Sequence, residues 1–281
     1  MEGDNLNVFI SAVWYLSKVS PLFKRFFWRQ SYQFLAKKYP EAYWTFMNCG
    51  YALQEGETPI SLHEEDEVNR YCIELYRRVA GAVDLGGKDV LEVGCGRGGG
   101  ASFVARYLQP AHMVGVDISA QAVALCKRLH VVDTLAFEVG DAEDLPFEDA
   151  TFDAVVNVES SHCYGSIPTF LDEVFRVLGP GGYFLIADFR VPQEVGLLRQ
   201  QVNDAGFVVC KEADITSQVS AALVLDNERK RNWIHSIIDP KMMNTFENFA
   251  GLEGTQMFDN LHNGTCCYVQ FVLQKPGDER V

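Results

Sequence analysis

Short apolar runs alternate with amphipathic stretches along most of the chain, and this alternation predicts its elements. We expect helices over the amphipathic stretches at 66–80, 99–108, 119–130 and 167–178. The apolar runs have the length of β-strands and lie at 89–93, 112–117, 134–138, 153–158, 182–187 and 266–274. Buried strands that alternate with helices are typical of a parallel sheet covered on both faces, so the pattern predicts an α/β fold.

Two segments do not follow this alternation. Residues 1–65 precede it, and we interpret them as an N-terminal helical arm before a main domain at 66–281. Within that domain, residues 190–262 read mostly helical and are rich in Phe, Met and Trp. Their apolar side chains suit either an ordinary core or a helical lid over an apolar tunnel.

Composition narrows the class of protein. The chain has 281 residues, 48% of them hydrophobic, which is enough for one large domain with an added cover. Its net charge of −14 would repel phosphate backbones, so we expect no nucleic-acid partner. No secretory signal or membrane-spanning run is visible, and the cysteines lack C-x-x-C spacing, so we expect reduced thiols and a cytoplasmic location.

The run VLEVGCGRGGG at 90–100 leads from the first expected strand into a glycine-rich loop. Ligands of open parallel sheets bind at the carboxyl ends of the strands, so this loop is expected at the binding edge. Gly94, Gly96 and Gly99 fit G-x-G-x-x-G, the dinucleotide fingerprint. Gly94, Gly96 and Gly98 equally fit G-x-G-x-G, and the run alone does not choose between a redox enzyme and another class.

Asp117 ends the second expected strand. A carboxylate there can accept hydrogen bonds from both ribose hydroxyls of an adenosine, in a nicotinamide enzyme and in a methyltransferase alike. The alternative is a helix N-cap.

Acidic residues around the glycine loop favour a cofactor without phosphates. Glu92 lies two residues before Gly94, where it would repel a pyrophosphate and favour the ammonium group of a methionine moiety. Asp141, Glu143 and Asp144 follow the third expected strand in GDAEDLPF. Such an acidic loop suits an adenine amine and a sulfonium better than two phosphates.

The motifs VLEVGCGRGGG, VGVDIS, GDAEDLPFEDATFDAVVNVES and VLGPGGYFLIADF resemble, in order and spacing, those of class I S-adenosylmethionine-dependent methyltransferases. Over about 45–275 the chain is most similar to the mycobacterial phthiotriol/phenolphthiotriol dimycocerosate methyltransferases and the fatty-acid O-methyltransferases. The resemblance implies a Rossmann-like fold with a mostly parallel seven-stranded sheet, and S-adenosylmethionine as cofactor. It also implies a set of cofactor-binding residues, namely Tyr51, Glu92, Gly94, Gly96, Gly98, Asp117, Ile118, Asp141, Ala142 and Asn157.

Methyl transfer to a hydroxyl group needs a general base near neutral pH, and His is the usual choice. His162 follows the fourth expected strand and Asp188 the fifth, so we expect a dyad in which the carboxylate orients the imidazole. The alternative is a loop histidine and a turn-capping aspartate. A carboxyl acceptor would need no base, because it is already ionised. We expect no metal, because no Asp-Asn pair follows the fifth strand.

The sequence therefore predicts an S-adenosylmethionine-dependent O-methyltransferase that acts on a hydroxyl group of an apolar, lipid- or polyketide-derived molecule. Three alternatives stay open: a fatty-acid carboxyl O-methyltransferase, an NAD(P)-dependent oxidoreductase and a non-catalytic cofactor-binding protein.

Residues 11–40 are basic and aromatic, in contrast to the acidic body. At helical spacing, apolar and basic side chains of this arm fall on opposite sides, Leu22, Phe23, Phe26 and Phe27 against Lys24, Arg25 and Arg29. Such a helix would lie in an anionic membrane interface, cover the cofactor pocket as a lid, or do both.

Overall fold

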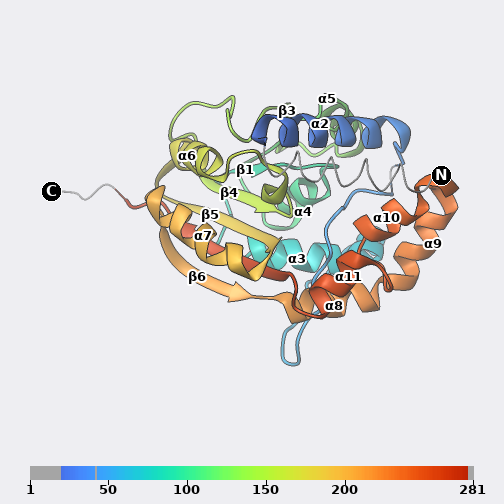
Figure 1. Cartoon of the computed structure of the whole chain (residues 1–281). Helices are drawn as coiled ribbons and strands as arrows, with labels where there is room; N and C mark the ends of the chain where they lie inside the picture. Colours follow the sequence, from blue (N-terminus) through green and yellow to red (C-terminus); the bar gives the residue numbers. More distant parts are fainter. Residues whose placement is uncertain (1–19, 42, 278–281) are drawn as a thin grey trace.

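The computed structural model describes residues 20–41 and 43–277, and its centre is a seven-stranded sheet (Figure 1). The order is β3-β2-β1-β4-β5-β7-β6, with β1 to β5 parallel and β7 antiparallel to its neighbours. The strands are β1 Asp89–Val93, β2 His112–Asp117, β3 Leu135–Val139, β4 Phe152–Val158, β5 Leu178–Arg190, β6 Val208–Asp214 and β7 Cys267–Gln274. The predicted Rossmann-like class is confirmed, and the strand order reverses between β1 and β4.

Helices cover both faces of this sheet, because the central strands β1, β4 and β5 bury side chains on two sides. One apolar cluster joins the sheet to α3, α4, α5, α8 and α11, and another joins it to α6 and α7. The longer helices are α2 Pro21–Lys38, α3 Arg70–Ala80, α4 Gly99–Tyr107, α5 Ala120–Leu129, α6 Ile167–Val177, α7 Pro192–Asp204, α8 Thr216–Leu225, α9 Asn227–Ile237, α10 Met243–Phe249 and α11 Gln256–His262. Short 3₁₀ turns are η1 Glu64–Asn69, η2 Ser161–Cys163 and η3 Pro240–Met242.

The structure differs from the sequence analysis within 190–262. This segment is mostly helical, but it also contains β6, which completes the sheet at its edge beside β7. The inserted helices therefore begin only at α8. The sequence of β6, VVCKEAD, does not have the apolar pattern that predicts a buried strand. It forms an exposed edge strand, and edge strands often carry charged side chains.

The arm and the inserted helices α9 and α10 pack against each other outside this layered body, whereas α8 and α11 pack on the sheet. In Figure 1, α2 runs beside α5, while α8 to α11 gather at the other end of the molecule. Of the arm predicted at 1–65, residues 1–19 and 42 lie outside the described residues. Across the part of the chain that the structure describes, no helix is both long and apolar enough to cross a membrane.

Candidate active site

A pocket lies at the carboxyl ends of β1, β2 and β3, next to the point where the strand order reverses. It is lined by five of the predicted cofactor-binding residues, namely Gly94, Asp117, Ile118, Asp141 and Ala142. The fold thus brings together residues from three separate loops, as expected for ligands of an open parallel sheet.

The glycine loop has the shape that a closely approaching ligand requires. Gly94 has a φ of 73°, and a side chain there would collide with Ser160. Gly98, with a φ of 80°, is the N-cap of α4. Glycine adopts such angles without strain. Gly94 exposes its backbone at the pocket, whereas Gly96 and Gly98 do not line it and leave room for Met47 and for the rings of His130 and Phe137. The first amide of α4, at Gly99, donates to the carbonyl of Thr45, so the protein itself uses that N–H.

Asp117 presents a buried carboxylate to this pocket. One oxygen accepts from the Gly96 amide at 2.9 Å and the other from the Ser119 amide at 2.8 Å. Each oxygen keeps a second lone pair, which can accept from a ribose hydroxyl. Burial raises the pKa of Asp117 to about 6 although both amides oppose the shift. The N-cap of α5 is Ser119, so the capping alternative for Asp117 does not hold.

Glu92 lies beneath the glycine loop and is 1% exposed. Its Oε1 accepts from the hydroxyl of Tyr76 at 2.6 Å, whereas Oε2 is buried without a partner among the described residues. Burial raises the pKa of Glu92 to about 7. Tyr76 and the backbone of Ala101 both act to lower this pKa, and Glu92 does not itself line the pocket.

The remaining wall of the pocket comes from α2, which lies where the lid interpretation of the arm places it. Ser20 caps this helix by accepting from the Phe23 amide, and Pro21 occupies its first turn. Its pocket-lining residues are Arg25, Trp28, Arg29 and Tyr32. The arm is basic and the loop at 141–144 is acidic. These opposite charges could have predicted the contact between them from the sequence.

Arg25 closes α2 over the predicted adenine end of the pocket. Its guanidinium forms an ion pair with Asp141 and a second, at 3.5 Å, with Glu143. Glu143 also accepts from the Gly165 amide. The two acids that we expected to face a ligand therefore face α2 in this structure.

The predicted dyad is assembled next to this pocket. Nδ1 of His162 lies 2.9 Å from Oδ1 of Asp188, which is 1% exposed near the end of β5. Oδ2 of Asp188 accepts from the hydroxyl of Ser161 and the amide of His162, and Arg190 lies 3.0 Å away. With Nδ1 bound to a carboxylate, Nε2 is the ring nitrogen that can exchange a proton with a substrate.

The charges around this dyad favour the imidazolium. Burial acts to lower the pKa of His162, but Cys163 and Asp188 outweigh it and raise the pKa to about 10. Burial likewise acts to raise the pKa of Asp188, yet Arg190 and His162 hold it below its usual range. The ring also contacts Phe189 and Trp28, with centroid distances of 4.3 and 6.3 Å. His162 therefore sits in a partly aromatic enclosure.

The other five predicted cofactor-binding residues do not line the pocket, namely Tyr51, Glu92, Gly96, Gly98 and Asn157. Tyr51 does not line the pocket, and its hydroxyl donates to Glu57 near Arg78. Tyr32 of α2 supplies an aromatic ring at the pocket instead. Asn157 acts indirectly, because its amide donates to the Val93 carbonyl and to the Tyr164 hydroxyl.

Glu159 has a structural role that the sequence did not predict. It follows β4 with a φ of 48°, an angle that costs energy for a residue with a side chain. Its Oε1 accepts from the Cys49 amide at 2.7 Å and from the Tyr268 hydroxyl at 2.9 Å. It thereby ties segment 43–49 to the carboxyl edge of the sheet.

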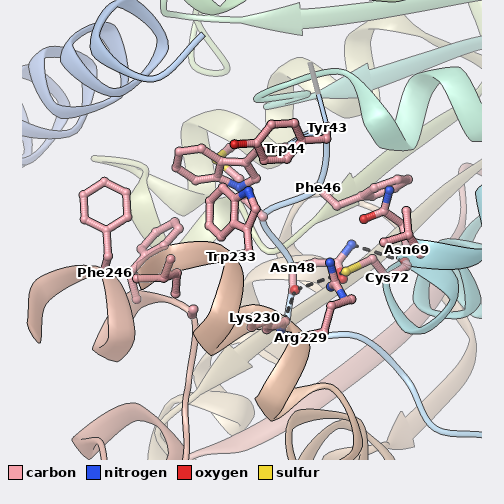
Figure 2. Close-up of a pocket in the computed structure, with 15 residues that line it drawn as sticks. Tyr43, Trp44, Phe46, Asn48, Asn69, Cys72, Arg229, Lys230, Trp233 and Phe246 are labelled. Carbon is pink, nitrogen blue, oxygen red and sulfur yellow. Dashed lines mark hydrogen bonds between the residues drawn. The ribbon is translucent and has the colours of Figure 1, made fainter. Parts of the chain in front are cut away.

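The inserted helices enclose apolar side chains together with the arm. A buried cluster joins Ile234, Ile238 and Phe246 to Tyr39 and Trp44. A second cavity lies beside this cluster (Figure 2). Within 20–41 and 43–277, no group of three or more His, Cys, Asp or Glu side chains is arranged to hold a metal ion.

Comparisons with known proteins agree with this geometry. Residues 91–186 match the family model described as a methyltransferase domain. The chain is 37% identical to a phthiotriol/phenolphthiotriol dimycocerosates methyltransferase of Mycobacterium tuberculosis, over 88% of this chain and 92% of the relative. It is 36% identical to a fatty-acid O-methyltransferase of Mycolicibacterium smegmatis, over 88% and 89%.

The solved structure of a [4+2]-cyclase superposes with a TM-score of 0.67, at 21% identity, over 89% of this chain and 95% of the cyclase. Because a protein named a cyclase shares the fold, the fold alone does not determine the reaction.

Proposed function

This chain belongs to the S-adenosylmethionine-dependent methyltransferases, and we propose that it methylates a hydroxyl group of an apolar small molecule with His162 as general base. The observation that carries the proposal is the His162–Asp188 pair beside the cofactor pocket. The names of the relatives, which refer to lipids, support an apolar acceptor.

Different residues at this site would bind different parts of S-adenosylmethionine. When bound, this cofactor supplies an electrophilic methyl group. Asp117 would accept from the ribose hydroxyls, and Asp141 would accept from the adenine amine once Arg25 withdraws. Gly94 gives the backbone access that the ligand needs. The unpartnered Oε2 of Glu92 favours the ammonium group of the methionine moiety.

His162 would remove the proton of the acceptor hydroxyl as the new oxygen–carbon bond forms. For this step its imidazole must be neutral, whereas Asp188 and Cys163 hold it in the charged form. Asp188 would then stabilise the imidazolium that results, and the proton leaves to solvent when the product departs. The aromatic rings of Trp28 and Phe189 would exclude water from the imidazole.

The same charge state favours a second candidate, O-methylation of a fatty-acid carboxyl group. A carboxylate needs no base, and an imidazolium at His162 would attract it. The name of the Mycolicibacterium smegmatis relative supports this candidate.

A matched pair of acceptors separates the two candidates. The protein is incubated with S-adenosylmethionine labelled in its methyl group and with a long-chain alcohol or the acid of the same length. Mass spectrometry of the lipid extract should show a labelled ether from the alcohol. A labelled ester alone would replace the hydroxyl proposal by the carboxyl one, and no labelled product from any lipid extract would contradict both.

His162→Ala tests the base directly. Ether formation should fall by about 10²–10⁴-fold, as for loss of a general base, while affinity for S-adenosylhomocysteine changes little. Retention of full activity on the alcohol would exclude His162 as the base.

A further inference from the structure

A second cavity lies on the far side of segment 43–48 from the glycine loop. It is enclosed by that segment, the start of α3 and helices α9 and α10, and its volume is about 150 Å³ (Figure 2). None of the residues that line it also lines the cofactor pocket. This cavity is therefore a separate space, about as large as one that accepts a benzene-sized group.

Most of the wall of this cavity is aromatic. Trp44 packs edge-on against Trp233 with ring centroids 4.8 Å apart, and against Phe246 at 5.8 Å. Phe249 and Phe46 extend the same lining. Such a wall suits a hydrocarbon chain, because burying apolar surface provides the favourable free energy of binding.

The cavity also has a cationic end, which Figure 2 shows at Lys230 and Arg229. Lys230 is 8% exposed, and its Nζ lies 3.5 and 3.4 Å from the carbonyl oxygens of Asn48 and Cys49. No carboxylate of the described residues forms an ion pair with it, whereas Arg229 is paired with Asp226. The carboxylate that acts on Lys230 electrostatically is the buried Glu159, which is outside the lining of this cavity, so the cavity itself presents a positive end that a negative group of a ligand would complement.

Two further polar atoms at the cavity lack partners among the described residues. Nε1 of Trp233 is a buried donor without an acceptor, which an anion would supply. Oδ1 of Asn48 is a buried acceptor, and a water molecule that hydrates the anion would satisfy it.

We propose that this cavity binds an amphipathic organic acid, with its carboxylate at Lys230 and its hydrocarbon chain between Trp44, Trp233 and Phe246. The acid is not the methyl acceptor, because segment 47–49 lies between. On one side Met47 packs against Gly96 of the glycine loop, and on the other Lys230 contacts Asn48 and Cys49. The site thus goes beyond the proposed function.

Binding of three eight-carbon probes to the full chain tests this assignment. Octanoate, octan-1-ol and octylamine are titrated calorimetrically, without cofactor and with saturating S-adenosylhomocysteine. Octanoate should bind about tenfold or more tightly than octan-1-ol, as for a hydrogen bond to a charged group, and octylamine most weakly. S-adenosylhomocysteine should leave the affinity for octanoate unchanged.

Lys230→Met should remove the preference for octanoate over octan-1-ol, while Lys241→Met, at an exposed lysine on η3, should keep it. If the Lys230 variant does not fold, the relative affinities of the three probes for the natural protein still test the assignment. Equal affinity for octanoate and octan-1-ol would overturn the assignment. Competition between octanoate and S-adenosylhomocysteine would instead place the acid in the cofactor pocket. Neither readout depends on turnover, so an inactive enzyme would not affect the result.

Discussion

The charge on His162 decides which acceptor this site can methylate. Because its neighbours raise the pKa of His162 to about 10, the charged imidazolium predominates at pH 7 before substrate binds. A hydroxyl acceptor needs that neutral form, whereas a carboxylate acceptor is favoured by the charged one. The pH dependence of the rate therefore reports on the chemistry.

If His162 is the base, kcat/KM for an alcohol acceptor should rise about tenfold per pH unit from 7 to 9. Asp188→Asn removes the negative charge that holds the proton, so the rising limb should move to lower pH. Rates measured across pH 6–10 with the natural protein and this variant provide the test. A rate that is flat below the pKa of His162 and falls above it would instead indicate a carboxylate acceptor.

Glu92 illustrates a carboxylate whose burial costs stability. Burial raises its pKa from an ordinary value near 4.5 to about 7, so the folded protein without cofactor binds a proton that the unfolded chain releases. Its contribution to stability is therefore greatest below about pH 4.5 and is lost as pH rises toward 7.

Glu92→Gln should raise the free energy of unfolding of the cofactor-free protein by roughly 3 kcal/mol at pH 8, and by little at pH 4.5. The amide oxygen can still accept from Tyr76. The same variant should bind S-adenosylhomocysteine more weakly, because it has no charge for the ammonium group. Denaturant titrations at both pH values and calorimetry measure these effects. Equal stability of the two proteins at pH 8 would show that Glu92 carries no such penalty.

At the scale of elements, α2 covers the cofactor pocket in the structure, in line with the lid interpretation of the arm. The basic residues that we expected on the outer side are divided. Arg25 points to the acidic loop and Lys24 is half-buried, whereas Arg29 is exposed although it also lines the pocket. Phe23 and Phe27 stack on each other and are half-buried. The helix is thus attached by an ion pair to the acid expected to bind adenine.

Arg25→Ala should increase the affinity for S-adenosylhomocysteine about two- to fivefold, because the ion pair to Asp141 no longer has to open. The pair is partly exposed, with 32% and 23% of the two side chains accessible, so its contribution is that of a surface pair, about 0.5–1 kcal/mol. Calorimetry measures the change, and Lys37→Ala, at an exposed position near the end of the same helix, is the control. Weaker binding by Arg25→Ala would mean that Arg25 holds the ligand rather than the lid.

At the scale of the whole molecule, the outer face of α2 contrasts with an acidic body. Three large apolar side chains are exposed along it, Leu22 at 75%, Phe26 at 61% and Phe34 at 46%. Arg29, Lys37 and Lys38 are exposed on the same helix. Because the chain carries a net charge of −14, a membrane would attract this face and repel the rest. We propose that α2 contacts anionic membranes when the protein collects its acceptor.

Co-sedimentation with vesicles tests this contact. The protein should bind vesicles that contain anionic lipid, and less strongly at high salt. Replacing Arg29, Lys37 and Lys38 by Gln should weaken binding by about a hundredfold, at roughly 1 kcal/mol for each charge. Phe26→Ser should also weaken it, unlike Leu197→Ser at the exposed Leu197 of α7. The absence of binding to anionic vesicles would leave α2 as a lid alone.

The sequence by itself determined the α/β class, the five parallel strands, the strand β7 and the loops that carry Gly94, Asp117, His162 and Asp188. These features are local or periodic: buried strands are apolar runs, and parallel strands place their following loops at one edge. Only the tertiary structure decided that β6 is a strand, since an edge strand need not be apolar. The tertiary structure also decided that Arg25 contacts Asp141 and that Lys230 lies beside Asn48. The residues of each pair are far apart in the sequence, and no periodic pattern links them. The charge on His162 depends on burial and on neighbours from two strand ends, and those exist only in the folded chain.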